Sequence, residues 1–428
     1  MKKWIATAAC IFSLTNLVKA QVHVNEELKN ILTAALNYYP KVKETQQSVQ
    51  LAEEKLKLTE LNKYPDFTLD ASYAYVQPKI QVAFGEKMFQ FAPEHNYGAA
   101  VNAVYTLADF GRLKANIEKS KFELQASKHA AAQLRANLFY QISQVYYQIV
   151  FAKKAIDIQN EILDVLNENK KVIESQLKNG NAIKLDLLTI QSKIDNEQNK
   201  KIDLETNLKK LSNLLSYASG IETVNGNQFN FELQKYTIEE ALQKAALNNA
   251  TLAIANDKIN IAKSDIAISK LGFKPYIGLK GSVGSKNGYL PAIQDQRFNY
   301  NAGLGFSVPL FNGGKTKQLV KIQEKGLSVQ ETNASAIVHE IEKDIKAALI
   351  DIQSNEQRIK NAASQIEQAA LAQKLSSAKL LNGTTTPIEL TSTNSDYQKA
   401  LFNQLQYEYR LCIAKIELAR LMGIVLLD

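Results

Sequence analysis

Residues 298–315 read FNYNAGLGFSVPLFNGGK, and this stretch decides the fold. From Phe298 to Leu310 every second residue is apolar, and the residues between them are small or polar. A strict period of two predicts a β-strand with one apolar and one polar face. Strands of membrane barrels have this pattern, because one face contacts lipid and the other faces an aqueous lumen.

Three more stretches alternate in the same way. They are residues 66–77, 97–107 and 275–284, and with 298–310 they form two pairs along the chain. Each is close to the roughly 9 to 11 residues that a tilted membrane strand needs. One such strand alone is typical of a soluble β-sandwich. Four strands in two pairs, each pair followed by the long helix described next, favour a membrane barrel instead.

Two very long helices follow the strand pairs. Residues 112–178 contain no proline or glycine, and residues 315–381 contain only Gly326. Apolar residues recur at spacings of three and four in both, which indicates helices packed against other helices. At 1.5 Å per residue each helix is roughly 100 Å long, so we expect the walls of a coiled coil or bundle. By themselves these helices would also suit a soluble coiled-coil scaffold.

The chain contains an internal duplication. Asn179-Gly180 and Asn382-Gly383 lie 203 residues apart, as do Asp186 and Glu389. We therefore predict a first repeat over residues 21–220 and a second over 238–428, joined by a linker at 221–237. Each repeat has a helix, two strands, a long helix, a short tip (179–184 and 382–387) and a return helix. The expected fold class is mainly α with a β-barrel part.

Four strands are too few to close a barrel around a lumen. An open edge in lipid would leave unpaired backbone groups that cost several kcal/mol each. We therefore expect the protomer to share its barrel with copies of itself, and three copies would supply 12 strands around a water-filled channel.

The N-terminus predicts export. Residues 1–20 combine Lys2 and Lys3 with an apolar stretch from Trp4 to Val18 and a cleavage site after Ala20, as in a signal peptide. Cys10 lies within that stretch and is a poor candidate for lipid attachment, so only Cys412 would remain, and it cannot form an intramolecular disulfide. The 51 Lys and Arg against 43 Asp and Glu are too small an excess to indicate nucleic-acid binding. After the signal no apolar stretch is long enough for a membrane-spanning helix.

The strand-to-helix corners and the tips resemble those of the TolC-like outer-membrane efflux protein family, also called outer membrane factors. The corners are YTLADFGR at 105–112 and the stretch that ends in Lys315, and glycine in each permits a sharp bend. The tips are NGNAIKLDLL at 179–188 and NGTTTPIEL at 382–390. The resemblance covers residues 26–423.

The resemblance implies a homotrimer with a 12-stranded barrel in the outer membrane of a Gram-negative bacterium. An α-helical tunnel of coiled-coil hairpins would continue the barrel into the periplasm, and residues 221–237 would lie in an equatorial belt. The protein would be the passive exit duct of a tripartite efflux pump or of a type I secretion system. Its partners would be outer-membrane lipid, a periplasmic adaptor protein and an inner-membrane pump.

The resemblance also suggests functional residues. Gly111, Gly313 and Gly314 would form the strand-to-helix corners. Glu389, and less strongly Asp186, would contribute to an acidic ring in the lumen, although each also suits the first turn of a helix. The residue three positions after Glu389 is Ser392, where some relatives have a second acid. The expected docking surface for the adaptor consists of Gly180, Asn181, Gly383 and Thr384, although the glycines would end the long helices in any case.

Other functions are less well supported. The four histidines are scattered and have no partner at metal-ligand spacing, so we expect no catalytic residues, no cofactor and no metal site. A periplasmic adaptor would have a single helical hairpin rather than two equal repeats. Residues 78–96 would form a loop at the outer mouth, where they would either constrict the opening or simply vary as loops do.

Overall fold

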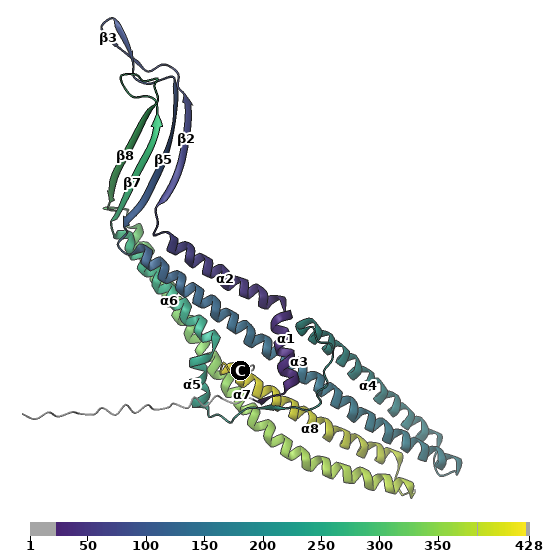
Figure 1. Cartoon of the computed structure of the whole chain (residues 1–428). Helices are drawn as coiled ribbons and strands as arrows, with labels where there is room; N and C mark the ends of the chain where they lie inside the picture. Colours follow the sequence, from purple (N-terminus) through teal and green to yellow (C-terminus); the bar gives the residue numbers. More distant parts are fainter. Residues whose placement is uncertain (1–22, 383, 425–428) are drawn as a thin grey trace, which may run out of the picture. The chain divides into compact units, whose positions relative to one another are not determined.

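The computed structural model describes residues 23–382 and 384–424, and the chain forms two compact units (Figure 1). Unit 1 combines the N-terminal segment up to Val42 with Leu134–Asn249 and the chain from Glu340 onward. Unit 2 consists of Lys43–Gln133 and Ala250–His339. The predicted signal peptide and Gly383 lie outside the described residues.

Unit 2 contains one antiparallel four-stranded sheet. Its strands are β2 (Asp66–Tyr75), β5 (His95–Ala108), β7 (Tyr276–Lys286) and β8 (Arg297–Ser307), in the order β2-β5-β7-β8. The helices of this unit are α2 (Pro40–Leu61), α6 (Ala250–Lys270), the 3-10 turn η1 (Leu271–Phe273) and the first parts of α3 (Arg112–Lys178) and α7 (Lys315–Leu381). Every strand of the sheet therefore has one end joined to a helix.

The strands differ in detail from the alternating stretches. β8 ends at Ser307 and not at Leu310, because Pro309 has no N–H to donate to a neighbouring strand. The loop expected at 78–96 contains a small hairpin, β3 (Gln81–Phe84) with β4 (Lys87–Gln90), which the sequence analysis did not predict. Gly85 makes the turn of this hairpin with a left-handed φ of 61°.

Unit 1 is built from the remaining parts of α3 and α7 and from four more helices. These are α1 (Glu26–Tyr38), α4 (Lys184–Ser219), α5 (Ile238–Asn248) and α8 (Pro387–Leu421). Strand β1 (His23–Val24) pairs with β6 (Phe231–Glu232), so the segment between the repeats contributes a strand to this unit. The core packs around Leu28, Leu32, Tyr146, Tyr147 and Ile416.

The single helix expected before each strand pair is wrong, because the structure has two helices in each place. Tyr39 separates α1 from α2 with an extended ψ of 116°, and proline at position 40 disfavours a helical conformation for the residue before it. Asn249 separates α5 from α6 with the same ψ of 116°. Its side-chain amide donates to the Leu421 carbonyl at 2.8 Å, a contact that holds this break in place.

Candidate channel faces and hairpin tips

The register of the sheet in unit 2 separates apolar from polar side chains. Paired residues of antiparallel strands project from the same face. One row across the four strands consists of Leu69, Val101, Val283 and Tyr300. The next row consists of Thr68, Asn102, Ser282 and Asn301. The alternation in each strand therefore adds up to one apolar face and one polar face for the whole sheet.

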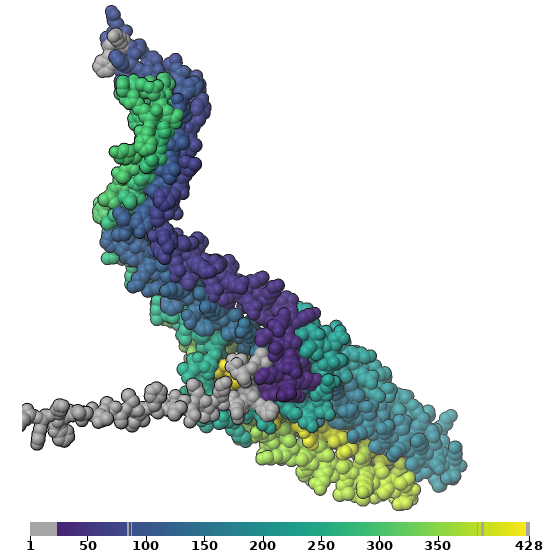
Figure 2. All heavy atoms as spheres, in the orientation of Figure 1, coloured from purple at the N-terminus to yellow at the C-terminus, as the bar shows by residue number. Residues whose placement is uncertain are grey.

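The apolar face is bare within the chain. Leu69 is 74% exposed, Leu304 72% and Tyr300 77%. Figure 2 shows the atoms of β7 and β8 (green) and of β2 and β5 (purple and blue) at the surface of the molecule in this view. Such a continuous exposed apolar surface marks a contact with lipid or protein. The strand order adds a second unsatisfied feature, since β2 and β8 each have a neighbour on one side only. In lipid, open edges of this kind would leave backbone groups unpaired.

The predicted corner glycines lie between strand and helix. Gly111 has a φ of 98°, Gly313 of 63° and Gly314 of 81°, values that favour glycine over residues with a side chain. Asp109 caps the start of α3, because its carboxylate accepts the N–H groups of Gly111 at 2.9 Å and Leu113 at 2.5 Å. The chain can therefore turn sharply from β5 into α3 without leaving these donors unpaired.

The two hairpin tips make the same hydrogen bond 203 residues apart. The N–H of Asn181 donates to the Gln176 carbonyl at 2.8 Å, and the N–H of Thr384 donates to the Lys379 carbonyl at 2.9 Å. These bonds close the C-terminal turns of α3 and α7, where Gly180 has a left-handed φ of 77°. The side-chain amide of Gln176 also donates to the Leu380 carbonyl at 2.8 Å, so the ends of α3 and α7 lie side by side.

Both candidate ring carboxylates make hydrogen bonds in the first turn of their helices. The Asp186 carboxylate accepts the Ile183 N–H at 3.1 Å, and the Glu389 carboxylate accepts the Thr385 hydroxyl at 2.6 Å. Glu389 is exposed, so its charge faces solvent in the isolated chain. Its N–H is capped by the Thr386 hydroxyl at 3.3 Å.

Sequence analysis missed an exposed apolar surface at the first tip. Ile183 is 61% exposed, Leu185 65% and Leu188 57%, all within the first residues of α4 and just before it. Leu381, at the end of α7, is 67% exposed. Ile183, Leu185 and Leu188 follow Gly180 in the sequence, whereas Leu381 precedes the second tip. Their exposure depends on how the helices pack, which the sequence pattern does not show.

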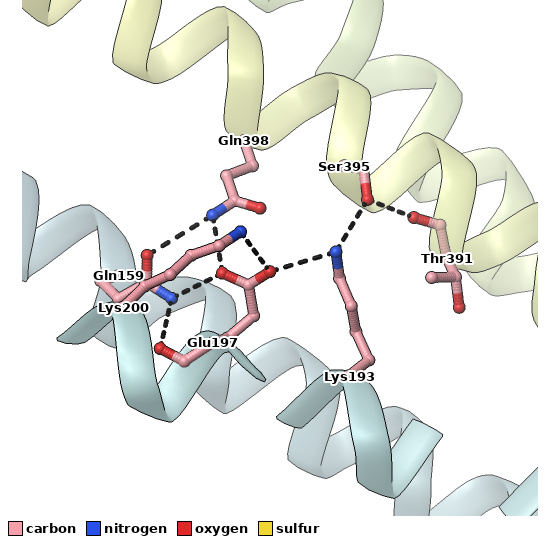
Figure 3. A network of polar contacts seen from close by, with 7 residues as sticks. All are labelled: Gln159, Lys193, Glu197, Lys200, Thr391, Ser395 and Gln398. Carbon is pink, nitrogen blue, oxygen red and sulfur yellow. Dashed lines mark hydrogen bonds and ion pairs between the residues drawn. The ribbon is translucent and has the colours of Figure 1, made fainter. Parts of the chain in front are cut away.

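Sequence analysis also missed a buried carboxylate between α3, α4 and α8 (Figure 3). The Glu197 side chain has no exposed surface and contacts Lys193 at 3.1 Å and Lys200 at 2.9 Å. The side-chain amides of Gln159 and Gln398 donate to its Oε2 at 2.9 and 3.0 Å. Burial by itself would raise the pKa of Glu197, but these donors outweigh burial and lower the pKa to about 2. Glu197 is therefore an ionised link between the two helical hairpins.

Metal-binding side chains do not cluster in the part of the chain that the structure describes. Among residues 23–382 and 384–424, no group of three or more His, Cys, Asp and Glu side chains is placed to hold a metal ion. Within the same part of the chain, none of the helices combines the length and hydropathy needed to cross a membrane. The features that remain are the two-faced sheet and the paired tips.

A sheet with a lipid-compatible face, in a chain that also forms two long helical hairpins, is typical of the class of outer-membrane ducts. The family model described as outer membrane efflux protein matches residues 31–220 and 241–424. The chain belongs to this outer membrane efflux protein family, which confirms the resemblance. It is thus a protein of the Gram-negative outer membrane, and the role of its family is transport rather than enzymatic catalysis.

Relatives and solved structures agree with this assignment. The chain is 22% identical to the cation efflux system protein CusC of Escherichia coli O157:H7 over 84% of this chain and 77% of CusC. It is 20% identical to the outer membrane protein TolC of Vibrio cholerae over 68% of this chain and 69% of TolC. A membrane protein from Pseudomonas aeruginosa has the same fold, with a TM-score of 0.83 at 17% identity over 94% of this chain and 91% of that one.

Proposed function

We propose that the chain is one protomer of a homotrimeric channel that forms the passive exit duct of a tripartite efflux pump. The observation that carries this proposal is the four-stranded sheet with two distinct faces and two open edges. Joining β8 of one protomer to β2 of the next satisfies both edges, and three copies give a closed barrel of 12 strands. The apolar face then contacts lipid and the polar face lines the channel.

The helical hairpins would continue this channel into the periplasm. Apart from the small hairpin of β3 and β4, the order of two helices, a strand pair, a long helix and a return helix occurs twice, which supports a duplicated protomer and an even tunnel wall. The relative CusC is named as part of a cation efflux system, which favours an efflux pump over a type I secretion system. An adaptor protein would dock at the tips and connect the duct to an inner-membrane pump.

The first test is the conductance of detergent-purified protein in a planar bilayer, with the oligomeric mass measured in parallel. We expect discrete channel openings from a trimer, because this four-stranded sheet can enclose an aqueous path through lipid only when it closes into a barrel. A water-soluble monomer without conductance would overturn the proposal and support a coiled-coil scaffold.

Docking at the tips predicts a loss of export without a loss of assembly. Tryptophan at Asn181 or at Thr384 would place a large side chain on the surface that the adaptor covers, while both residues keep the backbone hydrogen bonds that end the helices. We expect export to fall about tenfold or more, as for a steric clash in a small interface. The matched control is tryptophan at Gln191, which is half-buried farther along α4. Unaltered export by trimers that carry Asn181→Trp and Thr384→Trp would exclude the tips from docking.

The acidic ring predicts a change in ion preference. The variant Glu389→Gln keeps the shape of the side chain but removes one negative charge per protomer, so the preference for cations should fall. The variant Asp186→Asn is the comparison, because that carboxylate accepts a backbone N–H at the start of α4. Reversal potentials in a salt gradient measure both variants. Equal reversal potentials for Glu389→Gln and the unmodified channel would show that the Glu389 charge does not contribute to the ion preference of the lumen.

A further inference from the structure

The polar face of the sheet has an uneven distribution of charge. Its five charged side chains are Asp66, Asp70, Lys280, Lys286 and Arg297. Asp66 and Lys280 share one row through Val104, near the ends of the strands that join the helices. The last row at the opposite end contains two cations and no acid.

The two residues that carry these cations are paired directly across neighbouring strands. Lys286 and Arg297 are partners in the register of β7 and β8, where like charges on opposite residues are unfavourable. Within the described part of the chain, neither forms an ion pair within 4.0 Å. Glu94, an acid of the preceding loop, is instead paired with Lys79. Neither cation is therefore neutralised by a direct ion pair, although the loop between the two strands also carries Asp295.

The loop between the two strands holds the cations in place. The Lys286 ammonium lies 5.2 Å from the centre of the Tyr289 ring, and the Arg297 guanidinium donates to the Leu290 carbonyl at 3.3 Å. Asn287 anchors the loop, because its side chain donates to the His95 carbonyl at 2.6 Å and accepts the Tyr97 N–H at 3.0 Å. The two cationic side chains thus contact the anchored loop and do not project freely from the ends of the strands.

We propose that Lys286 and Arg297, three copies of each around the barrel, form a cationic ring at the outer end of the channel that binds multivalent anions with phosphate or carboxylate groups. The proposal rests on the trimeric barrel proposed above, which turns the polar face toward the lumen. A guanidinium and an ammonium on paired positions of neighbouring strands are a favourable combination for binding such oxygens. Repeating the pair around a narrow lumen concentrates anions there.

Block of the channel by inorganic triphosphate tests this ring. The probe is added on the barrel side of a planar bilayer at low salt, because the screening length is about 30 Å at 0.01 M salt but only about 10 Å at 0.1 M. We expect block of the unmodified channel that weakens as salt increases. In the variant Lys286→Gln/Arg297→Gln, the triphosphate concentration that gives half-maximal block should rise about tenfold. This factor is the lower end of the range by which electrostatic focusing raises local ion concentrations.

The charge-conserving variant Lys286→Arg/Arg297→Lys is the matched control and should be blocked like the unmodified channel. Equal block of the glutamine variant and the unmodified channel would overturn the proposed cationic ring. Conductance in both proteins would show that the proposed channel still holds. Absence of conductance in the unmodified protein would instead overturn the proposed channel. If the double glutamine variant fails to insert, Arg297→Gln alone tests the same ring, and unchanged block by triphosphate would again overturn it.

Discussion

Gly284→Ala should abolish assembly of the barrel. A Cβ atom at Gly284 would lie 2.6 and 2.7 Å from the Cβ and Cα atoms of Ala100, and still closer to the Ala99 carbonyl oxygen. These atoms belong to the neighbouring strand β5, so no side chain can rotate away and the pairing of β5 with β7 must open. Overpacking of this kind costs about 2 kcal/mol in each protomer, and a trimer would contain three such sites. Heat-modifiable trimer in outer-membrane fractions measures the loss.

Gly303→Ala is the matched control for this prediction. Gly303 lies on the same polar face, in β8, and no atom lies within 4 Å of the position that its Cβ would occupy. We expect normal amounts of trimer from Gly303→Ala. If Gly284→Ala assembles as well as Gly303→Ala, then β5 and β7 are not paired as described.

Glu197→Ala should loosen the contact between the helical hairpins. The change removes the buried carboxylate that accepts the side-chain amides of Gln159 and Gln398. These amides keep only the Glu197 backbone carbonyl at 3.1 Å and the Gln159 side-chain oxygen at 3.4 Å as acceptors. Loss of one member of a buried, charged network costs about 3 kcal/mol. Urea unfolding followed by far-UV circular dichroism measures this loss, and amide hydrogen exchange should become faster in α4 and α8 around the site.

The control for Glu197 is an exposed acid on the same helix. Glu205 is 46% exposed and lies 3.9 Å from Lys201, so Glu205→Ala should change the free energy of unfolding by less than about 0.5 kcal/mol.

The stabilisation by Glu197 should also depend on pH. Because its pKa is lowered from 4.5 to about 2, the full effect is present above pH 4.5 and is lost as the pH falls through about 2. An equal stability of Glu197→Ala and the unmodified protein at pH 7 would show that the network contributes nothing.

The sequence by itself determined the features that depend on local backbone geometry. A period of two in residues such as Phe298 and Tyr300 fixes which side chains share a face of a strand, wherever the strand lies. Residues 112–178 and 315–381 lack helix breakers apart from Gly326, and α3 and α7 have these same bounds. The glycines at the corners and at Gly180 are recognisable for the same reason, since a left-handed φ is a local requirement.

Only the tertiary structure decided which distant residues meet. The pairing of β5 with β7 joins the two halves of the chain, and it is this register that places Lys286 opposite Gly98 and beside Arg297. Glu197 resembles any helical glutamate with lysines nearby, and its burial depends on Gln398, which is 201 residues away. Such contacts follow from how whole helices and strands pack, and a pattern within one segment does not contain that information.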